Sequence, residues 1–257
     1  MAEENDKQIA VAVPGEWVIK KLLGPALDEI GGDLQVLYKV GRNKIISAAV
    51  RKTNTEDGQR ANLRVARDVF WNGSFTDESI CAEYFGGILA SSRSADGKDD
   101  RGIYYTDIIK SLSSQQLLFH YIIYSSFNKL WMEMPAETTR PNVGMGTELQ
   151  QYTAWYATVE LESFGVSVEK DLIALANKGL IDGNYEAKGH KLEDGKELPY
   201  TRMTPSTLGV QLYAVAHNKL PVWRNLPIED FGSFPDIKVP GHFALTIEGL
   251  LSKFGLK

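Results

Sequence analysis

The run from Leu117 to Met132 constrains the fold more than any other stretch, because its apolar residues leave almost no polar face on a helix. A helix that is apolar all round is either buried in protein or embedded in a membrane. Polar residues interrupt this run, and a membrane span needs about 20 mostly apolar residues. We therefore expect a buried helix, and its polar positions are His120, Ser125, Ser126, Asn128 and Lys129.

A second apolar helix is expected just before it. Thr76 is suited to cap this helix with its hydroxyl. One stripe at helical spacing then follows, made of Ile80, Cys81, Tyr84, Phe85, Ile88 and Leu89. Gly86 and Gly87 lie inside the helix, where each glycine costs about 1 kcal/mol relative to alanine. We expect either the close approach of a neighbouring helix or a kink at these glycines. The following helix should begin at a capping box formed by Ser113 and Gln116.

Composition bounds the class of protein. The chain has 257 residues and 43% apolar content, enough for one large or two small globular domains. A net charge of −5 argues against bulk binding to nucleic acid, although a local patch is compatible with it. A single cysteine excludes an internal disulfide. The first residues show no basic region followed by a long apolar run, so we expect no secretory signal and a cytoplasmic, bacterial protein.

Three segments are expected along the chain. The first is a helical domain over residues 1–134, with helices after Pro14, from the Gly24-Pro25 step to about Lys52, and from Gln59 to Trp71. Prolines and glycines predict a linker over residues 135–148. Residues 149–257 form the third segment, a winged-helix-like domain with an extended C-terminal tail. The predicted fold class is mainly α, with a helical N-terminal body and a small α+β winged-helix-like C-terminal part.

The winged-helix-like prediction rests on the order helix, hairpin, helix in residues 165–217. Ser167 caps the first helix, Asp194-Gly195 forms the hairpin turn, and the second helix runs from Pro205 to His217. Residues 149–161 remain ambiguous between helix and strand. DNA binding is the obvious function of such a module, but this stretch has six basic and seven acidic residues. A DNA backbone would meet no cationic face, so we expect protein contacts instead.

Basic residues gather between Lys39 and Arg67, where only Glu56 and Asp57 oppose them. Two interpretations remain open. One is a solvated helical face, and the other is a patch for nucleic acid or anionic lipid. The eight residues are Lys39, Arg42, Lys44, Arg51, Lys52, Arg60, Arg64 and Arg67.

The loop over residues 91–102 is dense in charge and lies between the two apolar helices. It is either a salt-bridged loop that pins the helices or a ligand site in which arginines bind an anion. His120 is expected to be a hydrogen-bonded core residue, with a general-base role if it shares a pocket with the loop. The candidate site residues are Arg93, Asp99, Asp100, Arg101 and His120.

The sequence contains no motif from which a catalytic residue, a cofactor or a metal site can be assigned. The sequence has no phosphate-cradling glycine loop, no HExxH motif and no nucleophile elbow. The four histidines lie at no metal-binding spacing.

Several segments resemble the abortive-infection alpha family of bacterial proteins. They are "KLLGPALDEIGGDL", "DESICAEYFGGILASSR", "DIIKSLSSQQLLFHYIIY", "KGLIDG" and "MTPSTLG". The resemblance extends from about Lys20 to Asn218, and the chain has serine and glutamine where the family has a "PLDA" step. It implies a role in phage resistance, and it transfers no catalytic residue.

Our first hypothesis is therefore a defence-type protein that acts by contacts with a protein partner or with itself. Nucleic acid is a further partner through residues 39–67, no transmembrane segment is expected, and peripheral contact with a membrane stays open. The alternatives are a winged-helix transcriptional regulator, and an enzyme or ligand sensor with a site at residues 91–102.

Overall fold

The computed structural model describes residues 27–135 and 137–256, with side-chain surroundings from residue 35 onward. The chain is mainly helical, as expected, with two small antiparallel sheets. The helix expected after Pro14 and the Gly24-Pro25 step lie outside the described residues.

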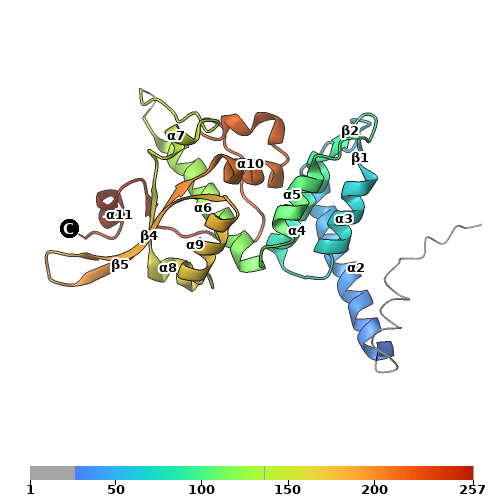
Figure 1. The fold of residues 1–257 in the computed structure, drawn as a ribbon, viewed down its shortest axis with the longest axis horizontal. Helices are drawn as coiled ribbons and strands as arrows, with labels where there is room; N and C mark the ends of the chain where they lie inside the picture. The colour runs from blue at the N-terminus through green and yellow to red at the C-terminus, as the bar shows by residue number, and fades with distance from the viewer. Residues whose placement is uncertain (1–26, 136, 257) are drawn as a thin grey trace, which may run out of the picture.

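One group of elements, which we call the N-terminal lobe, precedes residue 110 and lies on one side of the molecule (Figure 1). It contains α2 (Leu27–Arg51), β1 (Arg60–Ala61), α3 (Leu63–Gly73), α4 (Ser79–Ser91), β2 (Arg93–Ser94) and α5 (Gly102–Ile109). Strands β1 and β2 pair with each other, and this pairing was not expected from the sequence.

Two helix starts in this lobe differ from the prediction. Helix α3 begins at Leu63, since the Asn62 side chain accepts hydrogen bonds from the backbone N–H groups of Arg64 and Val65. Helix α4 begins at Ser79 rather than near Thr76. The Thr76 hydroxyl instead accepts from the Glu78 N–H at 3.2 Å, which closes a turn before the helix.

The remaining elements form the C-terminal lobe, on the other side in Figure 1. Its helices are α6 (Ser114–Glu133), α7 (Gly146–Leu149), α8 (Thr158–Ser163), α9 (Val168–Asn177), α10 (Thr207–Ala216), the 3₁₀ helix η2 (Leu220–Asn225) and α11 (Ile247–Lys253). Its strands are β3 (Ala154–Ala157), β4 (Ile181–Lys191), β5 (Glu197–Pro205) and β6 (Phe243–Ala244).

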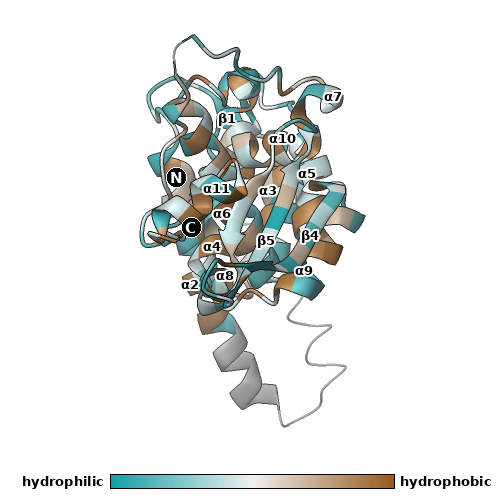
Figure 2. Ribbon diagram, turned by 90° about the vertical axis from the view of Figure 1, so that its left-hand side faces the viewer, coloured by the Kyte–Doolittle hydropathy of each residue, from teal (hydrophilic) through white to brown (hydrophobic). Residues whose placement is uncertain are grey.

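The four strands form one antiparallel sheet in the order β4-β5-β3-β6. The β4–β5 hairpin turns at Gly195, which has a φ of 81° and so adopts the conformation that glycine favours. Hydrophilic residues dominate this hairpin (teal in Figure 2), which extends away from the body in Figure 1. The ambiguous residues 149–161 contain both kinds of element, because β3 ends where α8 begins.

Helix α6 is the buried helix that the sequence predicts. The capping box of Ser113 and Gln116 is present, and side chains on every face of the helix are buried. No helix in the described part of the chain is long and apolar enough to cross a membrane. Of the polar interruptions, Asn128 donates to the backbone oxygens of Leu226 and Glu229 and accepts from the Phe231 N–H.

The main apolar core extends from Ile45 to Phe243 and includes both α4 and α6, and a smaller cluster contains Tyr200, Ala244 and Leu250. Residues 135–148, expected to be a linker, contain α7 and contribute the buried Val143 to this core. Strand β6 pairs with β3, so the C-terminal tail also becomes part of the sheet.

The paired glycines of α4 allow two helices to approach it closely. A Cβ built on Gly86 would lie 2.6 Å from the Cβ of Ala48 in α2. A Cβ on Gly87 would lie 2.2 Å from the backbone oxygen of Ala216 in α10. The close approach expected from the sequence is therefore present twice, and the Gly87 contact joins the two lobes backbone to backbone.

Replacement of Gly87 by alanine should lower the free energy of unfolding by about 2 kcal/mol or more, because the methyl group would overlap backbone atoms that have no rotamer to change. Urea denaturation measures the loss. The control is Gly146→Ala, since a Cβ at this helical glycine meets nothing within 4 Å. The control should be neutral or up to about 1 kcal/mol more stable. Wild-type stability in Gly87→Ala would contradict the packing.

Candidate functional site

The charged side chains of the loop at residues 91–102 form separate ion pairs rather than one cluster. Arg101 lies 2.5 Å from Asp99, and Arg93 lies 2.5 Å from Asp57 in the preceding loop. Asp100 pairs with Arg64 of α3 at 3.1 Å. The Arg101 guanidinium holds the pKa of the Asp99 carboxyl below its ordinary value. These contacts favour the interpretation of the loop as one that pins neighbouring segments.

His120 lies apart from this loop, inside the core on α6. Its Nδ1 is 2.5 Å from the Tyr84 hydroxyl, and its ring packs against Tyr124 at a centroid distance of 4.6 Å. Burial lowers the pKa of His120 to about 3, so the ring is neutral at physiological pH. The structure does not bring it together with Arg93, Asp99, Asp100 or Arg101. It is the hydrogen-bonded core residue that the sequence predicts.

The eight basic residues between Lys39 and Arg67 do not form one uniform patch. Arg64 pairs with Asp100 and Arg67 with the neighbouring Asp68, while Lys44 donates to the backbone oxygen of Asp77. Five of the eight are exposed, and these are Lys39, Arg51, Arg60, Arg64 and Arg67. Arg42 and Lys44 are half-buried on α2. Lys52 is also half-buried and, with Arg51, belongs to a different site.

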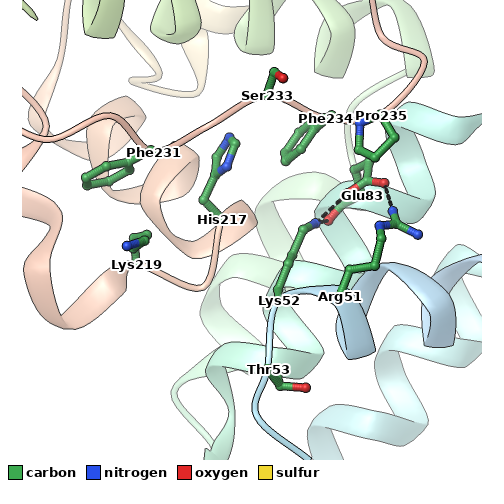
Figure 3. A pocket seen from close by; sticks show the side chains of 10 residues that line it. All are labelled: Arg51, Lys52, Thr53, Glu83, His217, Lys219, Phe231, Ser233, Phe234 and Pro235. Atoms are coloured by element: carbon green, nitrogen blue, oxygen red, sulfur yellow. Dashed lines mark hydrogen bonds and ion pairs between the residues drawn. The ribbon is translucent and has the colours of Figure 1, made fainter.

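That site is a cavity of about 510 Å³ between the two lobes (Figure 3). The N-terminal lobe contributes the end of α2, with Lys52, and Glu83 from α4. The C-terminal lobe contributes His217 and Lys219, which follow α10, and the segment from Phe231 to Pro235. Residues distant in sequence therefore surround one space.

Glu83 is the buried charge of the cavity, with 4% of its surface exposed. Its carboxylate pairs with Arg51 through Oε1 and lies 2.6 Å from Lys52 Nζ through Oε2. Lys52 Nζ also donates to the Glu83 backbone oxygen at 2.8 Å. A buried carboxylate requires such partners, because an unpaired charge in the interior is strongly destabilising.

Lys52 is buried between the Glu83 carboxylate and an aromatic ring. Its Nζ lies 4.6 Å from the centroid of the Phe234 ring. Burial lowers the pKa of the Lys52 ammonium to about 8, and the negative charge of Glu83 opposes that change. Lys52 therefore carries its charge at neutral pH and loses it in mildly alkaline solution.

His217 forms part of the cavity wall. Its ring packs between the aromatic rings of Tyr213 and Phe234, each at a centroid distance of 4.4 Å. Burial, with a smaller contribution from the positive charge of Lys52, lowers the pKa of His217 to about 3. Its Nε2 is buried and has no hydrogen-bond partner among the described residues.

Direct contacts hold the two lobes together beside the cavity. The Asn218 side chain donates to the Lys52 backbone oxygen at 2.7 Å. The Ser91 hydroxyl lies 3.2 Å from the Asn218 side-chain oxygen. Asn218 adopts a positive φ of 56°, a conformation that asparagine tolerates better than most residues.

Sequence reasoning did not find this cavity. The one available signal was Glu83, an acidic residue within the apolar stripe of α4. Its cationic partners Arg51 and Lys52 were grouped with the exposed basic segment instead. Among the described residues, no group of three or more histidine, cysteine, aspartate or glutamate side chains could hold a metal ion.

A scan against protein-family models finds no match, and searches of curated proteins and of solved structures find none either.

The buried histidines predict a loss of stability in mild acid. The pKa of His120 is about 3 in the folded chain and 6.5 ordinarily, so the unfolded chain binds more protons between these values. Stability from this group is complete above pH 6.5 and is lost as the pH falls. At pH 5 the loss should be about 2 kcal/mol from His120 alone.

Urea denaturation at pH 7 and pH 5 measures this loss. His120→Gln should reduce the difference between the two pH values, because glutamine does not titrate. His190→Gln, at a half-buried position on the hairpin, is the control and should leave the difference unchanged. An equal pH dependence in His120→Gln and in the wild type would refute the assignment.

Proposed function

We propose that this chain is a bacterial binding protein of the abortive-infection type, and that it acts through protein contacts made by its β4–β5 hairpin. The phage-resistance context rests on the resemblance of the quoted segments to the abortive-infection alpha family. The proposed mode of action rests on one observation: the β4–β5 hairpin projects from the body, and the outer edge of β4 pairs with no other described strand.

Strand β4 is the edge strand of the four-stranded sheet, and within the described residues it pairs only with β5. Its outer edge therefore presents backbone N–H and C=O groups to another chain. Addition of a strand to such an edge is a common mode of protein recognition, with affinity supplied by main-chain hydrogen bonds. The hairpin also extends from the body, so a partner can reach this edge (Figure 1).

A cluster of side chains stiffens the hairpin. Glu186 accepts hydrogen bonds from Arg202 Nε at 2.8 Å and from the Tyr200 hydroxyl at 3.1 Å, and it also pairs with Lys188. Hydrogen bonds from Lys188 and Arg202 lower the pKa of Glu186 to about 2, so these contacts persist at physiological pH. A rigid edge loses less conformational entropy when it binds.

A second candidate function is DNA binding by a winged-helix-like module. In its favour, the order α6, α7, β3, α8, α9, β4, β5, with β3 beside β5, resembles the connectivity of a winged helix apart from the short α7. Against it, six basic residues face seven acidic ones between residues 165 and 218. Helix α9, in the position of a recognition helix, exposes Glu169 as well as Lys170. Phosphate binding requires an excess of cations, so we place protein contacts first.

A shortened hairpin tests the proposed protein contact. Residues 189–199 are replaced by Asn-Gly, which joins Lys188 to its paired residue Tyr200 through a two-residue turn. Bacteria that express the wild-type chain should plate phage with reduced efficiency, and the shortened chain should lose this protection while it keeps its circular dichroism spectrum.

The control for this experiment is Arg101→Ala, which removes only an exposed ion pair with Asp99. It should protect cells as the wild type does. Full protection by the shortened chain would exclude the hairpin as the contact, and the absence of protection by the wild-type chain would remove the phage-resistance context.

A gel-shift experiment with duplex DNA separates the two candidate functions. We expect no complex at moderate salt, because residues 165–218 have no excess of positive charge. Binding through phosphates would appear at low salt and weaken steeply as salt increases. A complex that persists at moderate salt and depends on one DNA sequence would favour the regulator.

A further inference from the structure

The cavity between the lobes contains more positive charge than its own residues neutralise. Three cationic side chains line it, from Arg51, Lys52 and Lys219, and two carboxylates pair with them, Glu83 in the cavity and Glu229 beside it. A buried ammonium without full compensation is costly, and a bound anion would offset that cost. We propose that this cavity binds a small phosphate-bearing ligand between the two lobes, a site independent of the hairpin contact.

The charges of the site fit a phosphate group better than a carboxylate. Glu83 shares its charge between Arg51 and Lys52, so neither cation is fully balanced by it. Lys219 adds a third cation, whose partner Glu229 lies 2.8 Å away and is partly exposed to solvent. A phosphate monoester carries a charge of about −1.5 to −2 at pH 7 and has several acceptor oxygens, so it matches more than one cation.

His217 provides a second and independent indication of a ligand. The side chain is 91% buried, lines the cavity, and has an Nε2 atom without a hydrogen-bond partner in the described part of the chain. Figure 3 shows its ring on the same side of the space as Lys219 and opposite Lys52. Buried polar atoms are rarely left unpaired, and those that are require an explanation. Because Nε2 is itself buried, a ligand oxygen would supply the missing partner only after a shift of the cavity wall.

The shape of the site also fits a small ligand. A volume of about 510 Å³ lies within the range of about 300–1,000 Å³ found for pockets that hold small molecules. Phe231 and Phe234 form an apolar wall, and low local polarity strengthens the attraction between a phosphate and the cations. A phosphate on an organic body up to the size of a mononucleotide is therefore the class of ligand expected.

Such a ligand would connect the lobes, because Lys52 belongs to one lobe and both His217 and Lys219 belong to the other. Binding to the folded state alone would raise its stability by RT ln(1 + L/Kd), where L is the ligand concentration, and this quantity grows with the logarithm of that concentration once the site is saturated. We therefore expect the association of the two lobes to be more stable when the phosphate compound is bound.

Isothermal titration calorimetry of the full chain tests the proposal with three probes at constant ionic strength. Inorganic phosphate and adenosine 5′-monophosphate carry the group, and adenosine lacks it. We expect saturable binding of both phosphate compounds and none of adenosine. Absence of saturable binding of both up to about 20 mM, or equal binding of adenosine and its monophosphate, overturns the proposal.

Lys219→Gln is the variant of choice, because this side chain is 39% exposed and its removal leaves the buried Lys52–Glu83 pair intact. Loss of one charge-assisted contact should weaken phosphate binding about tenfold. The matched control is Lys196→Gln, since Lys196 also forms a lysine–carboxylate pair, with Asp194 at the hairpin turn. If both variants bound phosphate with equal affinity, phosphate would bind outside the cavity that Lys219 lines.

A pH series provides a readout that needs no substitution. Arg51, Lys52, Glu83, His217 and Lys219 face the ligand, and Lys52 loses its proton above about pH 8. Binding of adenosine 5′-monophosphate should therefore weaken between about pH 7.5 and pH 9.5, because the monoester, with a second pKa of about 6, stays doubly charged over this interval. Binding that strengthens over this interval would contradict a role for Lys52.

Discussion

The close packing of α4 between α2 and α10 is the constraint on which the rest of the structure depends. Gly86 allows α2 to approach at Ala48, and Gly87 allows α10 to approach at Ala216. Glu83 lies one turn earlier on the same face, since residues three and four apart are neighbours on a helix. Lys52 lies four residues beyond Ala48, directly after the end of α2. The glycine contacts thus fix both the distance between the lobes and the position where the buried ion pair forms.

Helix α6 shows how polar residues in an apolar helix can organise segments far away in sequence. Asn128 binds the backbone on both sides of residue 230, and the Tyr121 hydroxyl accepts from the Phe234 N–H at 2.9 Å. These bonds place Phe231 and Phe234 against the cavity. Asn128, a polar interruption of the apolar run, and the neighbouring Tyr121 are therefore the points that hold the C-terminal segment.

Local features were predictable from the sequence, whereas contacts between distant segments were not. The buried α6, its capping box and the hairpin turn at Asp194-Gly195 follow from periodicity and side-chain chemistry within a few residues. The start of α4 was misplaced because Thr76 caps a preceding turn. The cavity was not predicted, because Lys52, Glu83 and His217 come from three distant segments. No local sequence pattern indicates that these residues lie close together. The pairing of β6 with β3 was missed for the same reason.

The open edge of β4 limits what can associate with it. An unpaired edge strand is a template for uncontrolled aggregation, and charged residues and bulges are the usual protection. Here the register of β4 is irregular between Ile181 and Tyr185, and regular pairing begins only at Tyr185. Lys188 and Lys191 are exposed in the regular part. A partner strand of the kind we propose would therefore be short, and acidic side chains on it would complement the exposed Lys188 and Lys191.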